Sequence, residues 1–374
     1  MRTLVNRVSA MGTATIVVMG LSLAAIVEQA LLPTGQSAHQ RQAAAAPGPS
    51  KSRAKKPRPS RSVKRVSPTT LLSRQVKKAA TAQRGAVAKR EYGVGTVATP
   101  VVHVSRIARS WAFGTEAIPT PSGSSAAPES SLFLARASGT QWTVALAGTP
   151  KFADLIPKAP ESVVHKDERD ALKRFRTSGK APLETGLMLP WKIGQSWSAV
   201  ATESGTWGFD GGDGRVLAAG DGLLYRVCSA SPNRGMVLLV HPSGLATEYY
   251  QMDDITQVAD GEAVKRGDYL GRTSDDQSCG GGHAASKMVR FSLRDAEGPI
   301  SLDQVDVGGW TLHSTADEMF ADRGGLRISP GNPLLNFGTA PAPTPSPTPS
   351  KSPSKTKSPK APATGPANDP KAST

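Results

Sequence analysis

Apolar and polar positions alternate over short stretches in the second half of the chain, and tight-turn residues separate the stretches. From Gly186 onward, segments such as GRVLAAGDGLLYRV, GMVLLVHPSGLATEYYQM and KMVRFSLRDAEG carry apolar runs broken by Gly, Ser-Gly or Asn-Arg-Gly. Short strands with regular turn signals and no helical periodicity are typical of antiparallel β domains. The pattern therefore predicts an all-β, antiparallel domain over residues 186–338.

A small α+β accessory region is expected before this domain, over residues 101–185. The segments SLFLARA and WTVALAG are apolar and aromatic enough for a β-hairpin. The segment PESVVHKDERDALKRF follows, with charged residues at i,i+4 spacing and Ser162 or His165 near its start. These features predict a helix. No residue pattern in this region indicates a catalytic site.

Two polar segments are expected to be disordered and to flank these regions. Residues 339–374 are rich in Pro, Thr, Ser and Lys, which predicts an extended tail. Residues 33–100 are predicted to form a basic linker. Residues 51–90 hold 14 Lys and Arg and no acidic residue, and so supply nearly all of the formal net charge of +15.

The basic stretch at residues 51–90 has two interpretations: a solvated spacer, or an arm that binds a polyanion. Teichoic-type wall polymers and anionic lipid head groups are the polyanions that an exported chain meets. Nucleic acid is not expected, because the stretch lacks the interleaved aromatic residues on which bases stack.

The N-terminus carries the pattern of an export segment. After Arg2 and Arg7, residues 8–27 hold no charge, and the next charged residue is Glu28. A stretch of about 20 apolar residues suits either a signal peptide or a membrane-spanning anchor. Residues 1–32 are therefore predicted to be one of these two, which makes the protein extracellular or wall-associated, or anchored in the cytoplasmic membrane.

The two cysteines, Cys228 and Cys279, both lie in the second half of the chain. An even number of cysteines in an exported chain permits a disulfide. Neither a CxxC spacing nor a nearby His/Cys cluster indicates a structural zinc site. A Cys228–Cys279 bridge is predicted, and two separate buried thiols remain the alternative.

Six segments of the β domain occur in the order found in a known family. They are LPWKIGQSW, FDGGDGRVLAAGDGLLYRVC, HPSGLATEYYQM, VKRGDYLGRTSDDQSCGGG, RFSL and GGWTLH. Together they resemble the LasA/lysostaphin-type (LytM-like) zinc metallopeptidases, which cut peptidoglycan cross-bridges. The resemblance covers roughly residues 187–338. It implies a LytM-type antiparallel β-sheet fold (the duplicated hybrid motif) and peptidoglycan or its stem peptides as partner.

The family's zinc site is where this sequence departs from the resemblance. Met288 and Arg290 stand at the two positions of the family's His-x-His strand, Gln251 at that of the assisting His, and Gly208 at that of the zinc-binding Asp. The early His-bearing loop has no counterpart, since SWSAVATESGTWGF contains no His. Thioethers prefer soft metals, and a guanidinium cannot ligate a metal. The expectation is a pseudoenzyme without zinc.

Two functions of different class follow, together with a third that rests on the basic arm. The first is an exported, non-catalytic envelope protein that binds peptidoglycan or regulates wall hydrolases, since degenerate members of this family activate cell-wall amidases. Its ligand-binding candidates are Asp210, Asp213, Arg290 and His283. Arg290 either binds a stem-peptide carboxylate or forms an ordinary ion pair with Asp210 or Asp213 that fills the former site. The second is an active zinc endopeptidase with non-standard ligands. In the third, residues 51–90 bind an anionic polymer and the β domain is a rigid head.

Overall fold

The computed structural model describes residues 67–339, except 125, 177–181, 203–205, 232 and 316–317, together with Gly365. The predicted export segment, residues 33–66 of the predicted linker and nearly all of the predicted tail lie outside the described residues. Within the described part of the chain, no helix is both long and apolar enough to cross a membrane.

The helix α1 (Pro68–Tyr92) corrects the prediction of a disordered linker over residues 33–100. The side chain of Ser67 caps its start by accepting a hydrogen bond from the backbone N–H of Thr70, and Gly93 ends it in the left-handed conformation. Every fourth residue from Leu72 to Ala88 is buried. A helix that packs along one face can carry many exposed Lys and Arg residues on the other. The prediction of disorder rested on the high charge of this segment, and so it missed the row of buried residues.

The accessory region continues with a four-stranded antiparallel sheet and three short helical segments. These elements are β1 (Val101–Ala108), β2 (Trp111–Ile118), β3 (Glu129–Ser138), β4 (Gln141–Leu146), α2 (Pro150–Leu155), the 3₁₀ turn η1 (Ile156–Lys158) and α3 (Lys166–Arg174). The predicted hairpin is β3–β4, and the predicted helix is α3. His165 caps α3 in a capping box with Glu168. The β1–β2 hairpin was not predicted.

The central sheet contains 11 strands in the described residues, all paired antiparallel. The strands are β5 (Ser196–Ala201), β6 (Trp207–Asp210), β7 (Arg215–Leu217), β8 (Gly222–Ser231), β9 (Arg234–Val240), β10 (Ala246–Asp253), β11 (Ala263–Val264), β12 (Tyr269–Gln277), β13 (Gly282–Arg294), β14 (Pro299–Ile300) and β19 (Pro333–Leu335). A separate meander contains β15 (Val305–Val307), β16 (Trp310–Ser314), β17 (Met319–Arg323) and β18 (Leu326–Ile328). The predictions of an antiparallel β domain and of a preceding α+β region are both confirmed.

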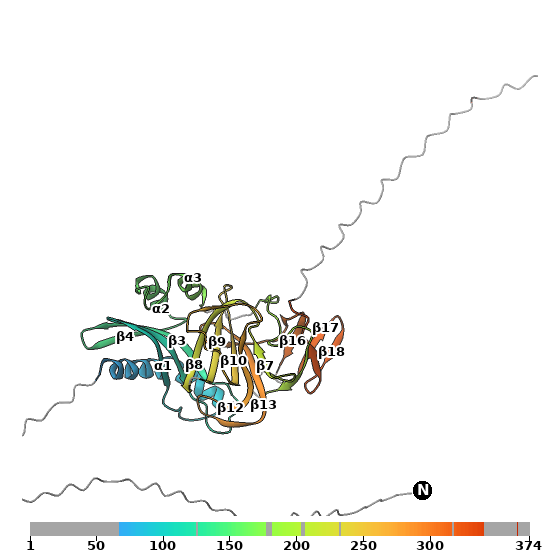
Figure 1. The fold of residues 1–374 in the computed structure, drawn as a ribbon, viewed down its shortest axis with the longest axis horizontal. Coiled ribbons are helices and arrows are strands. Elements are labelled where there is room, and N and C mark those ends of the chain that lie inside the picture. The colour runs from blue at the N-terminus through green and yellow to red at the C-terminus, as the bar shows by residue number, and fades with distance from the viewer. Residues whose placement is uncertain are drawn as a thin grey trace, which may run out of the picture. The chain divides into compact units, whose positions relative to one another are not determined.

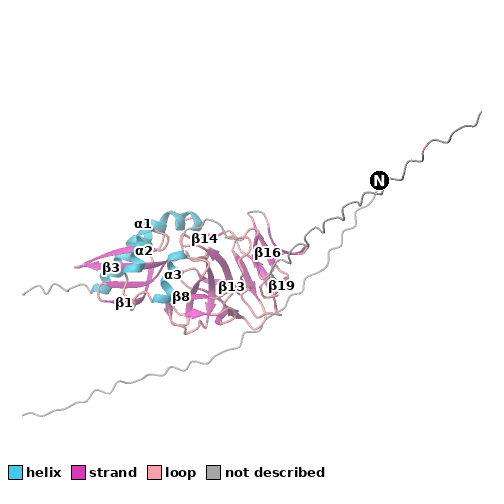
Figure 2. Ribbon diagram, turned by 90° about the horizontal axis from the view of Figure 1, so that it is seen from above, coloured by secondary structure: helices cyan, strands magenta, loops and turns pink. Residues whose placement is uncertain are grey.

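The four-stranded sheet packs against α1 on one face and against the central sheet on the other (Figures 1 and 2). Side chains alternate along a strand, so Phe133 of β3 lies in a core with Leu72 and Val76 of α1. Its neighbour Leu134 lies in a second core that includes Tyr225 of β8. The accessory sheet is therefore held on both faces by apolar packing.

The cysteines Cys228 and Cys279 form a disulfide, with Cα atoms 5.3 Å apart. Cys228 belongs to β8, and Cys279 follows the end of β12. The bridge ties the β12–β13 connection to β8. Next to it, the hydroxyl of Tyr250 donates a hydrogen bond to the carbonyl oxygen of Ser278 at 2.9 Å.

Candidate functional site

The central strand β13 brings three of the positions singled out in the sequence next to one another. Arg290 pairs in register with Tyr250 of β10 on one side and with Gly208 of β6 on the other. Met288 lies on the same face as Arg290, because side chains two residues apart on a strand point the same way. The sheet therefore gathers Gly208, Met288 and Arg290 into one place.

Met288 fills the space in front of Gly208. A Cβ atom on Gly208 would lie 2.9 Å from Sδ of Met288 and 3.1 Å from Cβ of Val200. Both distances are shorter than ordinary van der Waals contact between such atoms. An aspartate at position 208 therefore needs Met288 to move.

Arg290 is an enclosed cation, 4% exposed. Its Nη2 donates a hydrogen bond to Oγ1 of Thr206 at 3.4 Å. Burial raises the pKa of the neighbouring Tyr250 hydroxyl well above its ordinary value, and the positive charge of Arg290 opposes this rise. The guanidinium group of Arg290 is therefore buried, hydrogen-bonded to Thr206 and close to Tyr250.

Gln251 occupies a strained and buried position in β10. Its φ angle is 61°, in the left-handed region, at the irregularity where the register of β9 and β10 shifts. The side chain is 1% exposed, and its Nε2 donates no hydrogen bond to any described residue. Strained backbone and an unsatisfied buried amide each cost folding free energy, and both tend to cluster at functional sites.

The side chains at these four positions do not fit a zinc ion. Gly208 has no donor atom, and Arg290 is permanently protonated. Met288 offers a thioether, which prefers soft metals, and zinc proteins use Cys, His, Asp or Glu rather than the amide of Gln251. Among the described residues, no group of three His, Cys, Asp or Glu side chains could hold a metal ion. Part of the early loop, residues 203–205, lies outside the described residues.

The other predicted ligand-binding residues lie on exposed segments. Asp210 ends β6, and Asp213 lies in the turn before β7, where its Oδ1 accepts a hydrogen bond from the backbone N–H of Arg215. The side chain of His283 is 68% exposed, and its Nδ1 lies 3.8 Å from Oδ2 of Asp275. Arg290 is buried, whereas these three side chains are exposed, so the four predicted ligand-binding residues do not share one environment.

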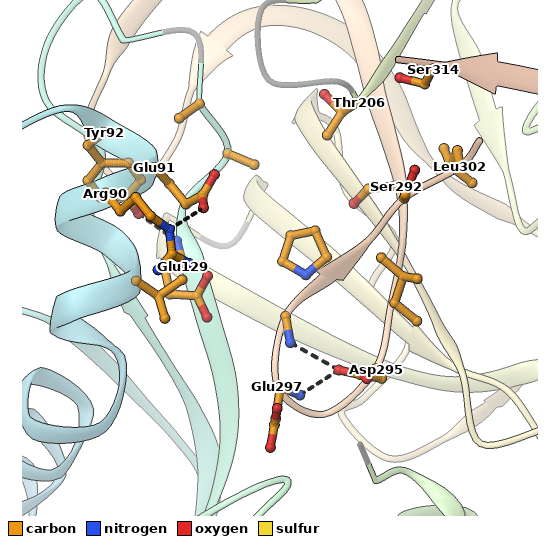
Figure 3. Close-up of a pocket in the computed structure, with 17 residues that line it drawn as sticks. Arg90, Glu91, Tyr92, Glu129, Thr206, Ser292, Asp295, Glu297, Leu302 and Ser314 are labelled. Atoms are coloured by element: carbon orange, nitrogen blue, oxygen red, sulfur yellow. Dashed lines mark hydrogen bonds and ion pairs between the residues drawn. The ribbon is translucent and has the colours of Figure 1, made fainter. Parts of the chain in front are cut away.

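A cavity of about 550 Å³ lies beside Arg290, between the C-terminal end of α1 and the β13–β14 turn (Figure 3). Thr206, which accepts the hydrogen bond from Arg290, lines it. Ser292 also lines it, two residues beyond Arg290 on the same face of β13. Figure 3 shows Glu91 and Glu129 on the side of α1, opposite Thr206 and Ser292. The lining residues come from segments more than 200 positions apart, so no sequence motif marked this cavity.

A network of buried charges fixes one wall of the cavity. Nη1 of Arg84 in α1 donates to Oε1 of Glu129 at 2.5 Å and to the carbonyl oxygen of Glu297 at 2.6 Å. Burial raises the pKa of the nearby Glu116 carboxyl to about 8, and the positive charge of Arg84 opposes this rise. These contacts join α1, β2, β3 and the loop after β13.

A second buried pair lies behind the same wall. Arg294 of β13 pairs with Glu248 of β10, and its Nη2 donates to the carbonyl oxygen of Ser130 at 2.8 Å. Oγ of Ser130 donates to Glu248 at 2.9 Å. The start of β3 is therefore fastened to the face of the central sheet that carries Arg290.

No protein-family model matches the chain. In sequence it is 28% identical over 181 residues to protease LasA of Pseudomonas aeruginosa, a match that covers 43% of this chain and 42% of LasA. It contains an M23 peptidase-like domain related to LasA. The sequence match to LasA thus confirms the family resemblance predicted from the six segments.

Solved structures similar to the M23-like domain include the M23 metalloprotease pseudoalterin, at 26% identity and a TM-score of 0.34, covering 40% of this chain and 97% of pseudoalterin. The catalytic domain of lysostaphin from Staphylococcus simulans matches at 16% identity and a TM-score of 0.21, covering 29% of this chain and 77% of that domain. The chain spans less than half the length of LasA.

Proposed function

We propose that this protein is an exported cell-envelope protein whose M23-like domain binds peptidoglycan, or regulates the hydrolases that act on it, without cutting it. The observation that carries the proposal is the side-chain set on β13 and β6. Met288 fills the space in front of Gly208, and Arg290 places a buried cation beside it. This set offers neither zinc ligands nor a general base, both of which hydrolysis by this family requires.

Export is supported by two features. The uncharged segment at residues 8–27 suits a signal peptide or an anchor. The Cys228–Cys279 disulfide is stable outside the cytoplasm, where thiols are not kept reduced. Peptidoglycan is the partner that the relation to lysostaphin-type proteins implies, and a cell-wall amidase is the hydrolase that such a protein would regulate.

A competing function is an active zinc endopeptidase with unusual ligands, which the similarity to a protease favours. It requires a metal site built from residues other than Gly208, Gln251, Met288 and Arg290.

A contribution from the basic arm is a further part of the proposal. The helix α1 keeps Arg74, Lys78 and Lys89 exposed. Exposed cations attract anionic wall polymers in a salt-dependent way.

The test is sedimentation of the full chain with isolated peptidoglycan, at low salt and at about 0.5 M salt, with and without added zinc. Salt-resistant retention without release of soluble fragments is expected, since binding by the folded domain is screened less than binding by exposed charges. Zinc-dependent release of fragments would overturn the proposal. Retention that vanishes at high salt would assign binding to the basic arm instead.

A further inference from the structure

A chain of hydrogen bonds joins a serine, a histidine and an aspartate that take no part in the site on β13. Oγ of Ser229 in β8 lies 3.2 Å from Nδ1 of His103 in β1. Nε2 of His103 lies 3.2 Å from Oδ2 of Asp260, in the turn before β11. Nucleophile, base and orienting acid follow one another in this order in acyl-transfer enzymes, which are recognised by geometry and not by sequence position.

Asp260 is the fixed end of this chain. It is buried, and its Oδ2 also accepts a hydrogen bond from the hydroxyl of Ser105. Its Oδ1 accepts from the backbone N–H of Arg226 at 3.1 Å and from Nε of the same residue at 3.0 Å. Burial alone would raise the pKa of Asp260, but the hydrogen bonds from His103, Ser105 and Arg226 outweigh it and hold this pKa at about 2. The carboxylate is therefore ionised and held in one orientation at neutral pH.

Two ion pairs lie beside the chain, and they match its charges. The guanidinium of Arg226 offsets the carboxylate of Asp260. Arg106, on the same strand as His103, pairs with the buried Glu168 of α3. The carboxylate that faces His103 is thus already neutralised by a cation. The role left to Asp260 is to orient the imidazole ring, which is also what the acid of a Ser-His-Asp triad does.

The orientation of His103 decides which of its nitrogens can act as a base. In the neutral ring, a proton on Nε2 that is donated to Asp260 leaves the lone pair of Nδ1 directed at the hydroxyl of Ser229. The serine of the best-known triads faces Nε2, so the two nitrogens exchange roles here. The sequence of contacts needed for proton transfer is the same.

Ser229 stands where the pairing of β8 and β9 is interrupted. Three residues of β8, Cys228–Ala230, face one residue of β9, Gly235. Such bulges redirect a side chain and leave backbone groups outside the regular ladder. Backbone N–H groups of this kind stabilise the oxyanion in acyl-transfer sites. Ser229 is half-buried and the side chain of His103 is 31% exposed, so the chain is open to solvent at its serine end.

We propose that Ser229 is the nucleophile of an esterase site that needs no zinc, with His103 as general base and Asp260 as positioning residue. Oγ of Ser229 attacks the ester carbonyl carbon and gives its proton to Nδ1 of His103. The bond from that carbon to the alkoxy oxygen breaks, and the alcohol leaves with the proton. A water molecule, deprotonated by Nδ1, then cleaves the acyl-serine. The carboxylic acid leaves, and the proton returns to Oγ.

The site suits esters of short carboxylic acids. An ester is more reactive than an amide and needs less stabilisation of its oxyanion. A short acyl group fits because the strands β1 and β8 partly cover both reacting side chains. The inference goes beyond the proposed function, since it uses none of the positions on β6, β10 and β13 and concerns a different bond.

The first test is labelling of the full chain with phenylmethylsulfonyl fluoride, which sulfonylates an activated serine and releases fluoride. Peptide mass spectrometry is expected to find the added group on Ser229. The labelled protein should no longer hydrolyse p-nitrophenyl acetate. No label, or a label only on other residues, would overturn the inference and identify the three side chains as a structural contact between β1 and β8.

Variants separate the site from general hydrolysis by surface imidazoles. Ser229→Ala and His103→Gln are each expected to lower kcat/KM for p-nitrophenyl acetate by at least about tenfold, well within the usual contribution of these roles. His283→Gln removes a side chain that is 68% exposed and lies outside the chain, and it should change nothing. Circular dichroism controls for folding. Unchanged hydrolysis in Ser229→Ala would contradict the proposal.

The positioning role of Asp260 has its own readout. The ¹⁵N chemical shifts of His103 distinguish a protonated ring nitrogen from a bare one, and we expect the proton on Nε2 in the native protein. In Asp260→Asn the amide can donate to Nε2, so the proton should move to Nδ1 and labelling of Ser229 should slow by at least about tenfold. A native protein with the proton on Nδ1 would overturn the inference, whether or not this variant folds.

Discussion

The Sδ atom of Met288 lies 2.9 Å from the place that a Cβ atom on Gly208 would occupy. The two residues come from β13 and β6, and each stands where the resemblance places a residue of the family's zinc site. A side chain at position 208 therefore requires the thioether end of Met288 to move aside. The side chains at these two positions are sterically coupled.

Gly208→Ala tests this contact. We expect it to lower the free energy of unfolding by about 1–3 kcal/mol, the range for overpacking a closed space. In the double variant Gly208→Ala/Met288→Ala the added methyl group has room, so the loss should be smaller than the sum of the two single losses. Urea denaturation measures both. Gly95→Ala, with open space around its Cβ position, is the control and should change stability little.

Arg84→Ala tests the link between α1 and the rest of the protein. It leaves the buried carboxylate of Glu129 and the buried carboxyl group of Glu116 without their nearest cation. Breaking a buried ion pair from one side costs about 3–5 kcal/mol. Arg74→Ala, an exposed arginine on the same helix, should cost less than about 0.5 kcal/mol. Equal losses from the two variants, measured by urea denaturation, would show that the network does not hold α1.

Glu116 should make stability fall as pH rises. Burial raises the pKa of its carboxyl from 4.5 to about 8, so between these values the folded protein holds a proton that the unfolded chain releases. Arg84, Glu129 and Arg294 are the charged groups that also act on this pKa. Relative to Glu116→Gln, the native protein should lose stability from pH 5 to pH 8, by at most about 1.4 kcal/mol per pH unit.

Unfolding curves of both proteins at pH 5, 6, 7 and 8 measure this difference. The glutamine variant keeps a neutral side chain at every pH, so titrating groups that do not interact with Glu116 affect both proteins alike and cancel in the comparison. A constant difference across these four pH values would mean that Glu116 does not titrate in this range.

The disulfide should contribute strongly to stability. Its cysteines are 51 positions apart, and closing a loop of this length in the unfolded chain corresponds to about 4 kcal/mol in the chain-entropy model. We expect Cys228→Ser/Cys279→Ser to lose about 2–5 kcal/mol, and the native protein to lose a similar amount in reducing agent. Thermal unfolding with and without reductant measures this. The double variant should be insensitive to reductant.

Local patterns predicted the elements whose signals are local. The β3–β4 hairpin and α3 follow from apolar runs, charge spacing and the cap at His165. The helix α1 was missed because its composition is that of a charge block. The buried side chains of α1 pack against Phe133 and Trp142 of the sheet that it covers, and the sequence of the helix alone does not reveal this contact.

The site was predictable only in part. The positions of Gly208, Met288 and Arg290 came from a motif, and the register of β6 and β13 brings them together. The hydrogen bond from Arg290 to Thr206 joins segments that are distant in sequence, and so does the cavity that Thr206 lines together with α1 and the loop after β13. Burial and contacts between segments that are distant in sequence produce no local sequence pattern, so they could not be predicted.

The most direct test of a non-catalytic M23-like domain is the zinc content of the purified full chain, measured by elemental mass spectrometry after incubation with zinc and removal of excess metal. The donor set at Gly208, Gln251, Met288 and Arg290 predicts well under one zinc ion per chain. A stoichiometry near one, retained by a folded protein, would contradict the account and identify a metal site made of other residues.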